Sequence, residues 1–257
     1  MKTRLIQLIA GFAMVVLCLM ICTTTSDATV IWSDDFYDGN YDGWNICEDA
    51  DLAAQLPGAG FNGSTWSATD GFLELVESPD PWGVISHPSN AAYGNWSFDF
   101  QDNDIQSRSG DAALVVFLSN DLYDWGVFSL DAKYYWIDFD LVTPENFTIS
   151  LKKRSGSTLT TIDTTEVPAA GWHYIDVIRD ITDGFFVYHN GALILQGEDS
   201  EFETSNQFWL WFQEGQIIDN IVVDTLVPPQ IPWVLVAVGS GVAGAVILMA
   251  IVLLKRR

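Results

Sequence analysis

The 257-residue sequence predicts an all-β fold: a two-sheet antiparallel sandwich placed between two apolar terminal segments. Two observations predict this fold class. Nearly every apolar stretch between residues 29 and 228 alternates with polar residues or is a short run of aromatic and β-branched side chains. These stretches are bounded by Gly, Asn, Asp or Pro, and no convincing amphipathic helix interrupts them.

The N-terminal segment has the layout of a secretory signal peptide. Lys2 and Arg4 precede an uncharged, mainly apolar run over residues 5–21, and a polar stretch follows. Small residues at Ser26 and Ala28 predict cleavage after Ala28, so we expect residues 1–28 to be the signal peptide. An uncleaved anchor is the alternative, because the apolar run is somewhat long for a signal.

The central segment, residues 29–227, is long enough for one well-filled domain. Of the 34 acidic residues only Asp27 lies in a terminal segment, and five of the 11 basic residues do, so the central segment has a net charge of −27. A surface of this charge repels polyanions and argues against nucleic acid as a partner. Cys47 is the single cysteine left in this segment, so no intrachain disulfide is expected.

Two segments show the period of a β-strand most clearly. Apolar residues alternate with aspartates over residues 137–141, and with threonine, serine and lysine over residues 147–152. Each predicted strand therefore turns one face to a core and one to water. The segment 208–212, Phe-Trp-Leu-Trp-Phe, is apolar on both faces, so it is either covered on both sides or exposes a ring.

A hairpin is predicted where residues 185–188 and 192–195 flank Asn190-Gly191. Asn-Gly supplies the two positive-φ positions of a type I′ turn. Further Asp-Gly turns are predicted at residues 70–71 and 183–184, and loops at residues 89–95 and 103–110.

Four motifs in this segment resemble the concanavalin A-like (laminin G-like) jelly-roll domains. They are the acidic-Phe and Gly-Trp steps of residues 34–44, the hairpin of residues 66–75, Trp172-His173-Tyr174 with the strands of residues 185–194, and the closing Asp-Asn-Ile-Val-Val of residues 219–223. The resemblance implies a jelly roll with adjacent first and last strands and a concave sheet that binds glycans in many members. It implies no activity, because this fold carries lectins, glycosidases and adhesion modules alike.

Acidic residues near the two ends of the domain are candidate ligands of a structural Ca²⁺. Asp34, Asp35 and Asp38 come near Asp219 if the first and last strands pair, and Ca²⁺ prefers such oxygen clusters. Related jelly rolls often hold a structural Ca²⁺ in this neighbourhood. Solvation is the simpler reading of the acidic charge as a whole.

Asp138 and Asp140 are the candidate catalytic carboxylates. They share one face of a predicted strand, and their setting is similar to the catalytic strand of family 16 glycoside hydrolases, although that family has Glu at both catalytic positions. Solvent-facing acids are therefore favoured over catalysis. His87, His173 and His189 show no paired ligand spacing, so no zinc site is predicted.

Four aromatic residues are candidate ligand-binding residues. Trp209 and Trp211 alternate on one predicted strand, and Tyr134 and Trp136 alternate on another. A ring exposed on a concave sheet is a platform for a sugar ring, whereas core packing is the commoner fate of large aromatics. Three N-glycosylation sequons, at Asn62, Asn95 and Asn146, fit an extracellular surface.

The C-terminal segment predicts a membrane tether. Residues 228–232 are a proline-rich stalk, and the 22 uncharged residues Trp233 to Leu254 reach roughly 33 Å as a helix, enough to span a bilayer. The basic residues 255–257 place the C-terminus in the cytoplasm and the domain outside. Small residues at Ser240 and Gly244 leave a homodimer through this helix open. A lipid-anchor signal is an alternative that the basic end disfavours.

The sequence thus predicts a single-pass cell-surface protein. Its leading predicted function is a recognition or adhesion module for carbohydrate. An extracellular glycoside hydrolase or lyase and a structural surface component with a protein partner are the alternatives.

Overall fold

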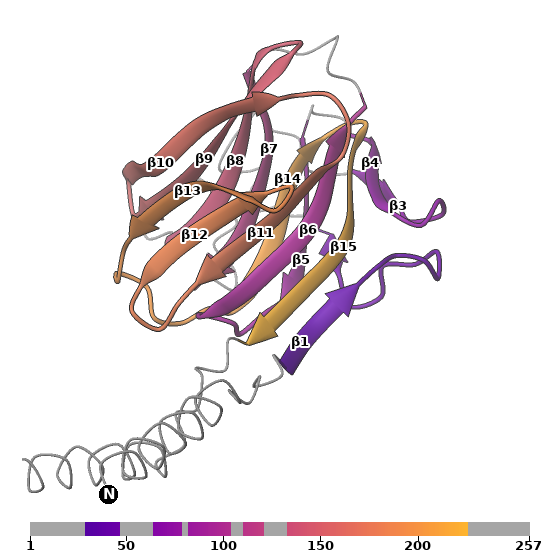
Figure 1. Cartoon of the computed structure of the whole chain (residues 1–257). Coiled ribbons are helices and arrows are strands. Elements are labelled where there is room, and N and C mark those ends of the chain that lie inside the picture. Colours follow the sequence, from indigo (N-terminus) through magenta and orange to yellow (C-terminus); the bar gives the residue numbers. More distant parts are fainter. Residues whose placement is uncertain (1–28, 47–63, 79–81, 104–109, 121–132, 226–257) are drawn as a thin grey trace, which may run out of the picture. The chain divides into compact units, whose positions relative to one another are not determined.

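The computed structural model describes residues 29–46, 64–78, 82–103, 110–120 and 133–225, with side chains of the fourth range described from Ala113 (Figure 1). The predicted signal peptide, stalk, transmembrane helix and basic tail lie outside these ranges, as do Cys47 and Asn62. Every regular element in the described ranges is a strand, and none of these residues belongs to an apolar helix of membrane-spanning length.

Eight strands form the first sheet, in the order β13-β12-β11-β6-β15-β4-β3, and β1 pairs with the later part of β15. The strands are β1 (Thr29–Asp34), β3 (Thr65–Ser67), β4 (Leu73–Glu77), β6 (Gly94–Asp102), β11 (His173–Arg179), β12 (Gly184–His189), β13 (Ala192–Glu198) and β15 (Gln216–Thr225). The first strand therefore lies beside the last, as the resemblance implied.

Seven strands form the second sheet, in the order β10-β9-β8-β7-β14-β5-β2. The strands are β2 (Asn45–Ile46), β5 (Trp82–Pro88), β7 (Gly110–Ser119), β8 (Lys133–Thr143), β9 (Asn146–Ser155), β10 (Thr158–Pro168) and β14 (Gln207–Gln213). All described pairings in both sheets are antiparallel, so the predicted all-β antiparallel sandwich is confirmed.

The main core lies between the two sheets and is rich in aromatic rings. On β8, Tyr135, Ile137 and Phe139 alternate with outward residues and are fully buried. Phe139 meets Phe100 of the opposite sheet with ring centroids 4.4 Å apart. The core-facing side predicted for residues 137–141 is thus confirmed. The prediction that the other side meets water is wrong at Asp138, which is buried because its carboxylate pairs with Lys152 on β9.

The Asn-Gly hairpin is confirmed: Asn190 and Gly191 have φ of 52° and 77°, the two positive values that a type I′ turn requires. The loop predicted for residues 89–95 extends too far, because β6 begins at Gly94. Trp96 and Phe98 alternate into the core from the start of this strand, and that burial outweighs the weak strand preference of Gly94 and Asn95.

Candidate ligand-binding face

The seven-stranded sheet carries a second apolar cluster on the face that points away from the core, which we call the outer aromatic face. It consists of Val84, Val116, Tyr134, Trp136, Trp209 and Trp211, with Trp82 and Leu114 packed against them. These residues alternate with core residues along β5, β7, β8 and β14, which form adjacent strands. The structure therefore brings all four predicted ligand-binding aromatics together on one face.

Neighbouring rings of this face contact one another. Tyr134 lies 5.2 Å from Trp136 along β8 and 5.3 Å from Trp209 of β14, measured between ring centroids. Trp82 of β5 meets Trp211 of β14 at 5.3 Å and 76°, which is the edge-to-face geometry that aromatic pairs prefer.

The four predicted residues are buried, with 4% to 9% of their surfaces exposed. They do not form open stacking platforms in this structure, although no described strand lies over them. The accessible part of the face is its margin, where Trp82 and Leu114 are partly exposed. The sequence did not identify Trp82, because a single tryptophan before Gly83 gives no period that would assign it to a face.

Polar side chains continue the outer aromatic face along β8 and β9. Asp138 is buried, and its Oδ2 accepts a hydrogen bond and ion pair from the Lys152 ammonium. Arg154 lies two residues further along β9, opposite Tyr134, and its Nε donates to the Gly156 carbonyl at 2.8 Å. Burial raises the pKa of the Tyr134 phenol, and the Arg154 charge opposes that rise.

The two candidate catalytic carboxylates lie in different environments. Asp138 is held by Lys152, whereas Asp140, at the next outward position of β8, is partly exposed. Lys152 and Arg154 could have been identified from the sequence, because they occupy the polar positions of the alternating segment 147–152 and its continuation.

The four candidate calcium ligands are used mainly by the turns that contain them. Asp34 accepts from the Phe36 amide at 2.9 Å and from Trp44 Nε1 at 2.8 Å, while Asp219 accepts from the Asn220 amide at 2.7 Å. Burial raises the pKa of Asp219, and the charges of nearby carboxylates, Asp34 and Asp35 included, add to the rise.

Asp35 and Asp38 likewise accept from backbone amides two residues ahead. The described residues contain no group of three or more His, Cys, Asp or Glu side chains that could hold a metal ion. The calcium site predicted from the sequence therefore gains no support from this geometry and stays a prediction.

Two histidines that are far apart in the sequence meet in the fold. His173 Nδ1 lies 3.0 Å from His189 Nε2, and His173 Nε2 donates to the Ala169 carbonyl at 3.2 Å. Burial lowers the pKa of both rings. Sequence spacing could not predict this pair, because it forms across strands β11 and β12.

The sequons that the structure describes differ in setting. Asn95 lies inside the eight-stranded sheet, between partners on β11 and β15, and its Oδ1 is buried. Asn146 begins β9 and is partly exposed. Of these two, Asn146 offers the more accessible acceptor.

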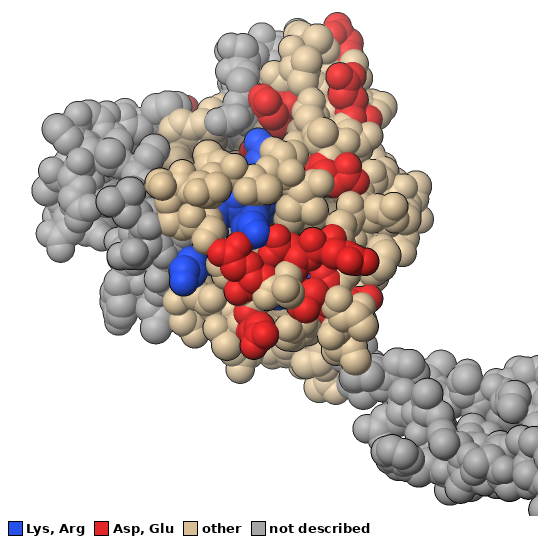
Figure 2. Space-filling view, turned by 90° about the vertical axis from the view of Figure 1, so that its left-hand side faces the viewer, with Lys and Arg blue, Asp and Glu red and all other residues tan. Residues whose placement is uncertain are grey.

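Acidic side chains gather on the side of the domain where β10 and β13 lie (Figure 2). Lys153 lies among them and forms ion pairs with Asp199 at 2.5 Å and Glu201 at 2.7 Å. Burial tends to raise the pKa of Asp199, but hydrogen bonds from Lys153 and Tyr135 outweigh it and hold that pKa below its ordinary value.

No family model matches the sequence, and no curated protein matches it. Solved structures do match the fold. The carbohydrate-binding module CBM66 from Bacillus subtilis is 15% identical, with a TM-score of 0.50 over 72% of this chain and 98% of that chain. The carbohydrate recognition domain of Emp47p is 11% identical, with a TM-score of 0.56 over 79% of this chain and 99% of that chain.

The β-glucanase of Bacillus licheniformis is also 11% identical, with a TM-score of 0.51 over 79% of this chain and 99% of that chain. At these identities the likeness concerns the fold alone, which is a β-sandwich of the jelly-roll kind. Binding modules and an enzyme occur among these structures, so the fold does not decide between recognition and catalysis.

Proposed function

We propose that this protein is a carbohydrate-recognition module whose binding surface is the margin of the outer aromatic face. The observation that carries the proposal is the junction of an aromatic cluster with a polar row on one sheet face. Trp82 on β5 and Leu114 on β7 are partly exposed beside buried rings, and Asp140 on β8 and Lys152 on β9 are partly exposed further across the same sheet. Apolar rings beside a few fixed polar groups are the usual composition of a ligand site.

The chemistry of the proposed contact follows from these side chains. Trp82 offers an indole to the apolar face of one sugar ring, while Asp140 and Lys152, three and four strands away in the sheet, can accept from and donate to hydroxyl groups of other residues in an oligosaccharide. Trp136 Nε1 is a buried donor with no hydrogen-bond partner among the described residues. A hydroxyl group that reached this donor would recover the free energy lost when it was removed from water.

Hydrolysis is the less favoured function. Two catalytic carboxylates must both face the scissile bond, one of them as a proton donor. Here Oδ2 of Asp138 is taken by Lys152, and Asp138 is almost fully buried. If the protein were a hydrolase that uses this pair, the Asp138→Asn variant would lose the turnover that a screen of polysaccharides detects in the unmodified protein.

A glycan array tests the proposed function. The full chain, in a detergent without a sugar headgroup, is applied with added Ca²⁺ and again with a chelator, and circular dichroism verifies its folding. Binding to one group of related glycans, reduced by Trp82→Ala, would support the proposal. A folded protein that binds no glycan under either condition would refute it, and the two conditions also test the calcium prediction.

The proposed location is the cell surface, with the domain outside. What supports it is the sequence alone: the signal-like residues 1–28, the apolar segment 233–254 and the basic tail. Protease treatment of intact cells should digest the domain and leave a membrane-bound C-terminal fragment. Chemical crosslinking of the same cells would detect a protein partner or a second copy, as expected for a structural surface component.

A further inference from the structure

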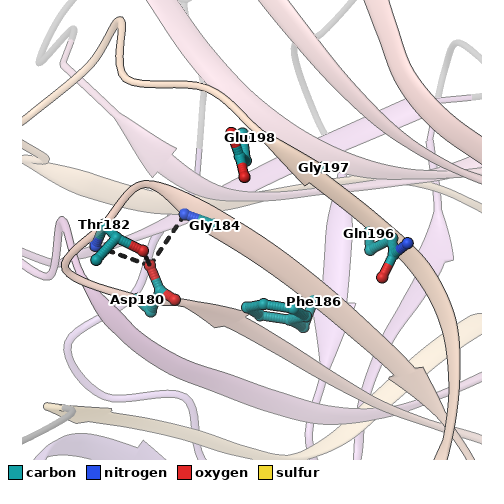
Figure 3. A pocket seen from close by; sticks show the side chains of 7 residues that line it. All are labelled: Asp180, Thr182, Gly184, Phe186, Gln196, Gly197 and Glu198. Carbon is teal, nitrogen blue, oxygen red and sulfur yellow. Dashed lines mark hydrogen bonds between the residues drawn. The ribbon is translucent and has the colours of Figure 1, made fainter.

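A pocket of about 460 Å³ lies on the eight-stranded sheet, and we call it the β12–β13 pocket. It is lined by Asp180, Thr182, Gly184, Phe186, Gln196, Gly197 and Glu198 (Figure 3). All of these residues belong to β12, β13 or the turn between β11 and β12. None belongs to the outer aromatic face, which lies on the other sheet.

The ring of Phe186 supplies the apolar surface of the pocket. It is partly exposed and lies between Asp180 and Gln196 in Figure 3, with Gln196 as its register partner on β13. A Cβ at position 184 would approach Phe186 Cε2 to 3.2 Å. Glycine at this position therefore leaves the edge of the ring uncovered.

Asp180 is held in one orientation by its own turn. Its Oδ1 accepts from the Thr182 amide at 2.8 Å, the Thr182 hydroxyl at 2.7 Å and the Gly184 amide at 3.0 Å. These hydrogen bonds, that of the Thr182 side chain first, hold the pKa of Asp180 below its ordinary value. Asp180 therefore presents an oriented carboxylate whose second oxygen, Oδ2, makes no hydrogen bond within the described residues.

Two further polar side chains complete the rim. The Gln196 amide group and the Glu198 carboxylate make no hydrogen bond to any described residue, and both residues are exposed. The strand that carries them is fixed, because the Gln196 backbone amide donates to Asp163 Oδ2 at 2.9 Å and Gly197 packs against Ile162 of β10. The acceptors thus project from a rigid strand rather than from a loop.

The chemistry of the lining selects a class of ligand. A partly exposed ring favours the apolar face of a sugar, and the two carboxylates and one amide accept hydrogen bonds from its hydroxyl groups. The carboxylates repel anionic ligands, and acidic side chains predominate on this side of the domain (Figure 2). We infer that the β12–β13 pocket is a second glycan subsite, which binds a neutral hexose residue independently of the outer aromatic face.

Saturation-transfer NMR on the full chain tests this inference. The probes are the methyl glycosides of glucose, galactose and mannose, in a detergent without a sugar headgroup. We expect saturation transfer to at least one of them, with affinity reduced about tenfold or more by Phe186→Ala and by Gln196→Ala. Leu193→Ala, at an exposed position of β13 outside the pocket, serves as the matched control and should leave binding unchanged.

The Trp82→Ala variant separates this subsite from the proposed function. Retained hexose binding in Trp82→Ala, with loss in Gln196→Ala, supports a subsite in the pocket even if the outer aromatic face binds nothing. Absence of transfer to all three glycosides, or equal binding by the folded Gln196→Ala and unmodified proteins, would overturn the inference. Preferential binding of methyl glucosaminide or methyl glucuronide would overturn the assignment to a neutral sugar.

Discussion

The indole rings of Trp82 and Trp211 meet edge to face, with centroids 5.3 Å apart, on the side of the seven-stranded sheet that points away from the core. Trp211 is buried at 9% exposure, whereas Trp82 is partly exposed. The pair therefore marks the boundary between the part of the outer aromatic face that supports the fold and the part that a ligand can reach.

The buried part of this face should contribute mainly to stability. Trp209→Ala removes a buried indole that contacts Tyr134, so we expect the free energy of unfolding to fall by about 3–5 kcal/mol. Trp172→Ala is the control, because Trp172 is 45% exposed, and it should change stability by less than about 1 kcal/mol. Urea denaturation measures the free energy of unfolding of both variants. Equal losses in the two would contradict a mainly stabilising role for the buried part of this face.

The Asp138–Lys152 pair gives a second prediction. Lys152→Met leaves a buried carboxylate without its ammonium partner, and we expect a loss of about 1–3 kcal/mol, reduced from the fully buried case because Lys152 is 26% exposed. The double variant Asp138→Asn/Lys152→Met should recover part of that loss. Additive losses in the double-mutant cycle would show that the two side chains are not coupled.

Acid should destabilise the domain through His173 and His189. Burial lowers the pKa of both rings, so the unfolded chain binds more protons, and the stabilising contribution is lost as pH falls below the ordinary histidine value of about 6.5. We expect the free energy of unfolding to fall between about pH 7.5 and about pH 5.5, and to fall less in His173→Phe. The same pH dependence in both proteins would exclude His173 as its source.

The contact between the two sheet edges can be tested at Gly197. A Cβ there would lie 2.3 Å from Ile162 Cγ2, so Gly197→Ala should destabilise the domain by about 1–3 kcal/mol. Ile162→Ala removes the clashing methyl group, and Gly197→Ala should be better tolerated in that background. Thermal unfolding of the four proteins measures the coupling, and an unchanged melting temperature in Gly197→Ala would contradict this contact.

Much of the fold could be predicted from the sequence, because strand period and turn chemistry are local. Apolar residues alternate over residues 137–141 and are buried as predicted, and Asn190-Gly191 forms the predicted turn. The sequence could not predict which aromatic side chains of the outer aromatic face are buried. Trp209 and Trp211 lie on a strand that is apolar on both faces, and only the structure shows that they are buried together with side chains of adjacent strands on the same face.

The candidate site was predictable in part, because the alternation of residues along a strand is local. Alternation assigned Tyr134 and Trp136 to one face, but the ion pair of Asp138 with Lys152 and the meeting of His173 with His189 depend on strand register. Register is set by contacts between distant segments, so a single sequence does not reveal it. The prediction of calcium ligands used residue type alone and could not foresee that turn amides occupy these carboxylates.

The most direct test of carbohydrate recognition compares glycan binding by the unmodified full chain, Trp82→Ala and Trp172→Ala. The two variants remove the same side chain from two accessible positions, of which only one borders the outer aromatic face. We expect Trp82→Ala to weaken binding to the glycan selected by the array about tenfold or more and Trp172→Ala to leave it unchanged. Unchanged affinity in a folded Trp82→Ala protein, or equal losses in both variants, would contradict the proposed site.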